Sequence, residues 1–72
     1  NVELSSRPPL ESLPTVQAAI AAAEKELGQE GRVLVRYSGT QNLCRVMAEG
    51  PTDEMVGRLC ESIADALRKA VG

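Results

Sequence analysis

Two arginines and two hydroxyl side chains stand close together in the middle of the chain, around a short polar segment. Arg36 comes two residues before Ser38, and the tripeptide Ser38-Gly39-Thr40 is followed five residues later by Arg45. Guanidinium forks and hydroxyl groups are donors that the oxygens of a phosphate accept. A glycine also permits positive φ, with which successive N–H groups can turn inward around an anion. The pattern therefore predicts a phosphate site at Arg36, Ser38, Gly39, Thr40 and Arg45.

The charges are distributed so that this segment is positive although the whole chain is slightly negative. The 72 residues carry eight Lys and Arg against ten Asp and Glu, a formal net charge of −2. Residues 31–48 contain three arginines and no acid, whereas the rest holds five basic and ten acidic residues. A local cationic patch made only of arginine favours an anionic partner. By itself, Ser38-Gly39-Thr40 is more typical of a plain polar turn; the two flanking arginines are what favour a phosphate site, and the plain turn stays open as the alternative.

Residue types that are absent exclude several kinds of chemistry. The chain has no His, which removes the usual proton shuttle near neutral pH and the commonest ligand of transition metals. Cys44 and Cys60 are its only thiols, and they do not form a C-x-x-C pair. A zinc site is therefore not expected. The two cysteines are expected to be small buried hydrophobes in a reducing compartment, and a disulfide or a reactive thiol is the alternative.

The predicted site lies on a β-hairpin. Segments 32–37 and 43–49 are rich in β-formers and are separated by five turn residues, the spacing of two antiparallel strands. Because side chains alternate along a strand, Arg36 and Arg45 are expected on the same face, close to the turn. Three apolar residues share this face: Leu34, Leu43 and Met47. The opposite face carries Val33, Val35, Tyr37, Cys44, Val46 and Ala48.

Two predicted helices follow the 3.6-residue period. Residues 13–27 place an apolar side chain every three or four positions, with a proline in the first turn and Gly28 directly after the last. Thr52 is a good N-cap for a second helix, which keeps the same spacing to about residue 70. Polar and apolar residues alternate over positions 1–5, as in a strand with one solvated face. Residues 5–12, with three serines and two prolines, are expected to form an extended or flexible connector.

The predicted order β-α-β-β-α indicates an α+β fold, a two-layer sandwich in which an antiparallel sheet carries two helices on one face. The length allows one small domain, residues 1–72. With 43% apolar and 25% charged residues, the composition is that of a globular protein. No apolar run approaches the roughly 18–20 residues of a membrane span. The chain does not begin with Met, so we expect it to be a segment of a longer protein.

The hairpin resembles a known sequence block. Residues 31–50, GRVLVRYSGTQNLCRVMAEG, are similar to the C-terminal phosphate-binding segment of the α-D-phosphohexomutases. The R-x-S-G-T core and the following R-V-M-x-E-G look most like those of the bacterial phosphoglucosamine mutases. The flanking helices fit the last domain of that family in order and length. The resemblance therefore covers the whole chain and implies the TATA-box-binding-protein-like fold of that domain.

What the resemblance implies is one domain of a larger cytoplasmic enzyme with four domains around one cleft, which interconverts glucosamine 6-phosphate and glucosamine 1-phosphate. The phosphoserine and the Mg²⁺ ion of such an enzyme lie in other domains. This chain would hold no catalytic residue and no metal, and alone it would be inactive. Its partners would be the phosphate group of the phosphosugar substrate and the other domains of the same chain. The residues that match the family's phosphate contacts are Arg36, Ser38, Gly39, Thr40 and Arg45.

Two turn positions depart from the commonest pattern of the family. Gln41 stands where Glu is usual, and Asn42 stands where Pro is usual. The loss of an acid beside the site favours an anion slightly, and the loss of a proline removes a fixed φ. Neither change removes a hydrogen-bond donor from the turn, so the donor set is expected to be kept in a less rigid turn.

Other functions remain as alternatives. A phosphomannomutase or phosphoglucomutase relative is the alternative within the family. A non-enzymatic α+β interaction module is the alternative of another class, since three apolar side chains lie beside the two arginines on the predicted open face. Nucleic-acid binding is not expected, because the chain is net acidic and has a single aromatic residue. A membrane-surface role is not expected either, because the second predicted helix is more acidic than basic before its last turn.

Overall fold

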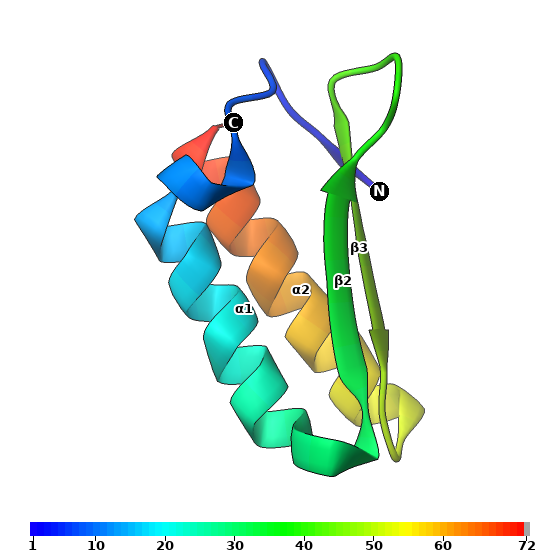
Figure 1. The fold of residues 1–72 in the computed structure, drawn as a ribbon. Coiled ribbons are helices and arrows are strands. Elements are labelled where there is room, and N and C mark those ends of the chain that lie inside the picture. The colour runs from blue at the N-terminus through cyan, green and yellow to red at the C-terminus, as the bar shows by residue number, and fades with distance from the viewer. Residues whose placement is uncertain (72) are drawn as a thin grey trace.

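The computed structural model describes residues 1–71 and has the predicted α+β architecture (Figure 1). Three antiparallel strands form one sheet in the order β1-β3-β2, and helices α1 and α2 both lie on one side of it (Figure 1). Two short 3₁₀ helices, η1 and η2, flank α1. The elements in chain order are β1 (Val2–Glu3), η1 (Leu10–Ser12), α1 (Pro14–Leu27), η2 (Gly28–Glu30), β2 (Arg32–Tyr37), β3 (Leu43–Glu49) and α2 (Asp53–Ala70).

The core lies between the helices and one face of the sheet. Exposed and less exposed residues alternate strictly along β2, as expected for a strand with one covered face. The largest fully buried side chains are Cys44 of the central strand β3, Ile63 and Leu67 of α2, and Val16 of α1. The buried apolar residues are Val2, Leu4, Val16, Ala23, Leu27, Cys44, Leu59, Ile63, Ala64 and Leu67.

Local sequence signals account for where the helices begin and end. The Thr52 hydroxyl accepts a hydrogen bond of 3.1 Å from the Met55 N–H and so caps α2, as predicted. Gly28 follows α1 with φ of 58°, a conformation that glycine adopts without steric cost. Two expectations were wrong in detail: Ala70 is exposed rather than part of the buried stripe, and Cys60 is only half-buried. Both lie at the margin of the α2 apolar face.

A glycine allows the two long strands to meet at the end of the hairpin away from its loop. A Cβ at Gly31 would lie 1.9 Å from the backbone oxygen of Glu49, so no other residue fits there without a shift of the backbone. The register then runs from Arg32 opposite Glu49 to Tyr37 opposite Cys44. This register fixes which side chains face each other near the loop.

The connector between β1 and α1 differs from the expected extended or flexible segment. It contains η1, and Leu10 and Leu13 pack against the core. The Gln17 side-chain amide donates a 2.9 Å hydrogen bond to the Leu10 carbonyl, and the Ser12 hydroxyl donates one of 2.6 Å to the Pro9 carbonyl. The connector is therefore held against the sheet and α1. In the described part of the chain, neither helix has the length and apolarity that crossing a bilayer demands.

Candidate functional site

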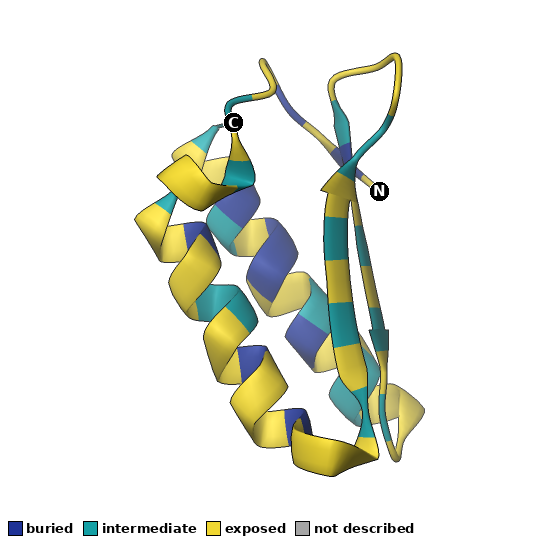
Figure 2. Cartoon of the chain, viewed as in Figure 1, coloured by how far each residue is buried: buried dark blue, intermediate teal, exposed yellow. Residues whose placement is uncertain are grey.

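The predicted site residues lie at one end of the molecule, where β2 and β3 are joined. The loop Ser38–Asn42 projects beyond the helices, and the N-terminal segment runs beside it (Figure 1). The Ser38 N–H donates a 2.8 Å hydrogen bond to the Leu43 carbonyl and closes the hairpin. Four of the five loop residues are exposed, and Ser38 is half-buried (Figure 2). A ligand can therefore approach the loop from solvent.

Arg36 and Arg45 face each other directly across the two strands, as the sequence predicted. They lie on the sheet face that no helix covers, and both are exposed. Because Ser38 and Leu43 form a hydrogen-bonded pair, the alternation of an antiparallel ladder makes Arg36 and Arg45 the next such pair, with Cα atoms about 5.5 Å apart. Two guanidinium groups thus leave the sheet side by side.

No carboxylate neutralises these two arginines within residues 1–71. Four ion pairs engage other cations of the chain, and neither arginine takes part in any of them. Like charges placed directly opposite each other in a sheet are destabilising. The guanidinium groups of Arg36 and Arg45 therefore repel each other when no anion is bound between them. The four ion pairs are Arg32–Glu49, Arg58–Glu26, Arg68–Glu61 and Lys69–Asp65.

Hydrogen-bond donors of the loop are also available. Within the described residues, no backbone hydrogen bond uses the N–H groups of positions 39–42 as donors. Neither the Ser38 nor the Thr40 hydroxyl makes a hydrogen bond to that part of the protein. Exposed donors of this kind form hydrogen bonds with water, and they can exchange these for hydrogen bonds to the oxygens of an anion. These N–H and hydroxyl groups of the loop and the two arginines thus form a cluster of donors for which the described residues supply no acceptor.

A polar hollow of about 260 Å³ lies between the loop and the arginines. Its lining includes four of the five predicted site residues, and Thr40 is outside it. The lining residues are Arg36, Tyr37, Ser38, Gly39 and Arg45. The structure therefore brings Arg36, Ser38, Gly39 and Arg45 together around one space and leaves Thr40 at its margin.

The detailed shape of the loop differs from the prediction in two respects. Gly28 is the glycine with positive φ among residues 1–71, so Gly39 does not adopt the conformation expected for an inward-turned nest. The Ser38 N–H is occupied by Leu43 and is not available to a ligand. With Asn42 where proline is usual, nothing in the loop fixes a backbone angle covalently. The free N–H groups begin at Gly39.

Two side-chain hydrogen bonds that sequence reasoning missed join the loop end of the hairpin to the connector. Arg7 donates from Nη1 to the Ser38 carbonyl at 2.9 Å, and the Tyr37 hydroxyl donates to the Pro8 carbonyl. Burial raises the pKa of the Tyr37 hydroxyl, which stays a donor at neutral pH. The contacts join segments about thirty residues apart along the chain. The Ser/Pro-rich composition of the connector was the only signal near Arg7, and it favoured a loop rather than a contact.

One acidic residue borders the site. Glu3 pairs with Leu43 in the β1–β3 ladder, so its side chain lies on the same open face as Arg45 and diagonally across from it. It makes no ion pair with Arg45 within the 4.0 Å limit of such a contact. Its charge is close enough to weaken the attraction of an anion to the site without neutralising it.

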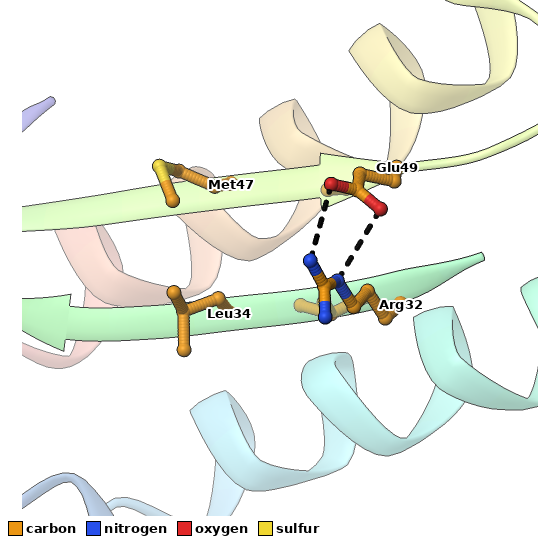
Figure 3. A pocket seen from close by; sticks show the side chains of 6 residues that line it. Arg32, Leu34, Met47 and Glu49 are labelled. Carbon is orange, nitrogen blue, oxygen red and sulfur yellow. Dashed lines mark hydrogen bonds and ion pairs between the residues drawn. The ribbon is translucent and has the colours of Figure 1, made fainter.

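The other end of the open face is apolar. Leu34 and Met47 stand opposite each other on β2 and β3, and 44% and 49% of their surfaces are exposed (Figure 3). A hollow of about 230 Å³ reaches from them to the ion pair of Arg32 with Glu49 (Figure 3). Unlike the arginines near the loop, Arg32 has its counter-charge within the protein. At this end of the open face the arginine is already paired with a carboxylate, so an anion is not expected to bind here.

The residues described do not provide a metal site. No group of three or more His, Cys, Asp or Glu side chains among residues 1–71 is arranged to hold a metal ion. Both cysteines are free, and burial raises the pKa of the Cys44 thiol. Cys44 lies in the core and behaves as the small buried hydrophobe that was expected. The chemistry that this arrangement supports is anion binding by hydrogen bonds and charge.

Comparison with known proteins agrees with the sequence resemblance. Residues 1–66 match the family model described as phosphoglucomutase/phosphomannomutase, C-terminal domain. The chain is 51% identical over 72 residues to the phosphoglucosamine mutase of Syntrophobacter fumaroxidans and 51% identical to that of Syntrophus aciditrophicus. It is 54% identical to the phosphoglucosamine mutase of Anaeromyxobacter dehalogenans. Each match covers 100% of this chain but only 16% of the relative, so the chain spans about one sixth of their length.

Proposed function

Because this chain belongs to the phosphoglucomutase/phosphomannomutase family, whose C-terminal domain it matches, we propose that it binds the phosphate group of a phosphorylated hexose. The site would be the end of the β2–β3 hairpin. Arg36 and Arg45 would supply positive charge and paired donors, and Ser38, Gly39 and Thr40 would supply hydroxyl and N–H donors. Thr40 would reach the phosphate from the margin of the hollow.

The observation that supports this proposal is the Arg36–Arg45 pair, which has no counter-ion among residues 1–71. Placing two like charges opposite each other costs a sheet about 0.2–1 kcal/mol. A phosphate dianion between them would turn this repulsion into two charge-assisted contacts, which are about twice as strong as neutral hydrogen bonds. A plain turn requires neither arginine. The arrangement is therefore better explained by an anionic ligand than by the stability of the hairpin.

We extend the proposal to a larger enzyme of which this chain would be the fourth domain. The relatives are named phosphoglucosamine mutase, and the larger enzyme would interconvert glucosamine 6-phosphate and glucosamine 1-phosphate. It would be cytoplasmic, and its phosphoserine and Mg²⁺ would lie in domains outside this chain. In such a reaction the phosphate that does not react must be held while the other one is transferred. Binding of the non-reacting phosphate by this domain would align the reacting oxygen. The binding energy from this remote group would then lower the activation barrier of the phosphoryl transfer.

The test of phosphate binding is a titration of the ¹⁵N-labelled chain with inorganic phosphate at constant ionic strength. We expect amide shifts that concentrate at residues 36–45 and fit a dissociation constant on the order of millimolar. Chloride at the same ionic strength should leave the chemical shifts of these amides unchanged. Shifts spread evenly over the surface, or none at the loop, would refute the proposal.

The role in a larger enzyme is tested by steady-state kinetics of the full-length mutase with Arg36→Ala. A hydrogen bond to a charged group is worth about 1.5–3 kcal/mol, so kcat/KM should fall roughly ten- to a hundredfold. Lys25→Ala, which removes a remote charge from α1, is the control and should leave kcat/KM within a factor of two. Normal turnover of the Arg36 variant would reject the assigned role.

A protein-interaction module is the second candidate, and the exposure of Leu34 and Met47 favours it. Such a module would associate through the open face in a concentration-dependent way. Sedimentation of the chain at increasing concentration, with and without Met47→Ser, tests it. Association that Met47→Ser abolishes, in a chain whose loop ignores phosphate, would favour the module over the phosphate site.

A further inference from the structure

Arg7 occupies a carbonyl that the hairpin itself leaves free. In a regular antiparallel ladder, the hydrogen bond from the Ser38 N–H to the Leu43 carbonyl would be returned from the Leu43 N–H to the Ser38 carbonyl. Among the backbone hydrogen bonds of the described residues, only the first of the two is present, at 2.8 Å. The Ser38 carbonyl instead accepts a hydrogen bond from the Arg7 guanidinium, which donates from Nη1 at 2.9 Å.

The position of Arg7 is fixed by its neighbours in the connector. On one side of it, the Leu4 N–H donates a 2.9 Å hydrogen bond to the Asn42 carbonyl at the far end of the loop. On the other side, the Tyr37 hydroxyl donates to the Pro8 carbonyl. The connector is thus tied to both ends of the loop, and Arg7 lies between the two ties. Its contact with Ser38 is therefore part of a built arrangement.

Holding the Ser38 carbonyl also holds the first free donor of the site. The Ser38 carbonyl and the Gly39 N–H belong to the same peptide unit, which is planar and trans, so they point in opposite directions. Gly39 has no side chain, and a Cβ at this position would meet nothing within 4 Å among the described residues, so the loop is open around the Gly39 Cα. Arg7 is the only side chain that hydrogen-bonds to this peptide among residues 1–71. Its contact therefore sets the direction of the Gly39 N–H.

The charge of Arg7 also changes the strength of that donor. A hydrogen bond from a charged group to a carbonyl polarises the peptide, and neighbouring bonds in such a chain strengthen one another by about 10–30%. Gly39 lines the polar hollow with Arg36 and Arg45, so the donor whose hydrogen bond to an anion is strengthened is the Gly39 N–H. Arg7 itself does not line this hollow. It borders an adjoining hollow of about 520 Å³ beside α1, which shares Arg36 and Tyr37 with the first, and its hydrogen bond to the site is the one to the Ser38 carbonyl.

We propose that Arg7 is a positioning residue of the anion site: by binding the Ser38 carbonyl it orients and polarises the Gly39 N–H toward an oxyanion held by Arg36 and Arg45. The proposal rests on the proposed phosphate binding and adds to it a residue that does not touch the ligand. It predicts that the Gly39 amide responds to Arg7 before any phosphate is present.

The test is the phosphate titration by NMR, repeated for Arg7→Ala, Arg7→Gln and Arg7→Lys, with Lys25→Ala as a charge-matched control remote from the loop. Arg7→Ala should weaken binding about three- to tenfold, the range for one hydrogen bond. In that variant the Gly39 amide proton should move upfield in the free protein, and its phosphate-induced shift should shrink more than that of Thr40. Arg7→Lys and Arg7→Gln keep a donor and should restore part of both effects. Lys25→Ala should bind within a factor of two of the unchanged chain.

The outcomes distinguish failure of phosphate binding from failure of the role of Arg7 alone. If the unchanged chain shows no response at the loop, phosphate binding fails and the role of Arg7 fails with it. If the unchanged chain binds, but Arg7→Ala binds within a factor of two of it or leaves the Gly39 amide in place, only the role of Arg7 is overturned. Equal weakening by Arg7→Ala and Lys25→Ala would also overturn it, because the effect would then be one of net charge.

Discussion

Replacing Arg36 by glutamine separates the stability of the hairpin from its ability to bind phosphate. Glutamine keeps part of the apolar stem and an amide donor but removes the charge that faces Arg45. Since both side chains are exposed and neither has a counter-ion among the described residues, relief of the repulsion should stabilise the sheet. Without phosphate, the free energy of unfolding of Arg36→Gln should equal or exceed that of the unchanged chain by about 0.2–1 kcal/mol.

Phosphate should cancel or reverse this order. A ligand that binds only the folded state stabilises it by RT ln(1 + [L]/Kd), which is about 1.4 kcal/mol at ten times Kd. If the variant binds about tenfold more weakly, the same phosphate concentration stabilises it by only about 0.4 kcal/mol. The difference of about 1 kcal/mol corresponds to roughly 4–8 °C in Tm for a domain of this size.

The assay is urea unfolding with and without about ten Kd of phosphate, with sodium chloride used to keep the ionic strength constant. Arg32→Gln is the matched control, because Arg32 lies on the same face of the same strand but is paired with Glu49. That control should keep the full stabilisation by phosphate. A variant Arg36→Gln that is destabilised by more than about 1 kcal/mol without phosphate would contradict the reasoning, as would equal stabilisation of both proteins.

Three further predictions follow from the same structure. Glu3→Gln removes the acid that shares the open face, so phosphate should bind about two- to threefold more tightly in the NMR titration; unchanged affinity would place Glu3 too far away to matter. The hydrogen bond from Arg58 lowers the pKa of Glu26, so their contact should stabilise the fold above the ordinary pKa of 4.5 and be lost as the pH falls below it. Urea unfolding should therefore show Glu26→Gln less stable than the unchanged chain at pH 7 but not at pH 3, and a difference that persists at pH 3 would count against the pair. Cys60 is half-buried whereas Cys44 is fully buried with a raised thiol pKa, so iodoacetamide should modify Cys60 first, as mass spectrometry would show; rapid modification of Cys44 would contradict the described core.

The elements were predictable from the sequence because each has a local signal. The strands at 32–37 and 43–49 lie at the residues expected from their alternation, and α2 begins after the N-cap Thr52. The facing of Arg36 and Arg45 was also predictable, since strand alternation and a five-residue turn determine which side chains share a face. Short-range regularities of this kind require no knowledge of distant contacts.

The details of the site were less predictable because they depend on contacts between distant segments. No local pattern indicates that Arg7 binds the Ser38 carbonyl or that Tyr37 binds the Pro8 carbonyl. Gly39 does not adopt the positive φ that its residue type permits, and no local pattern determines which of the allowed conformations a loop glycine takes. The donors of the site are therefore arranged by the connector as well as by the turn.

A crystal structure of the chain grown in phosphate at about ten times the dissociation constant would show directly whether the hairpin end binds an anion. We expect a phosphate whose oxygens accept hydrogen bonds from the guanidinium groups of both Arg36 and Arg45 and from the Gly39 N–H, with Arg7 on the Ser38 carbonyl. A phosphate bound elsewhere, or two arginines that turn away from each other and leave the loop without an anion, would contradict it.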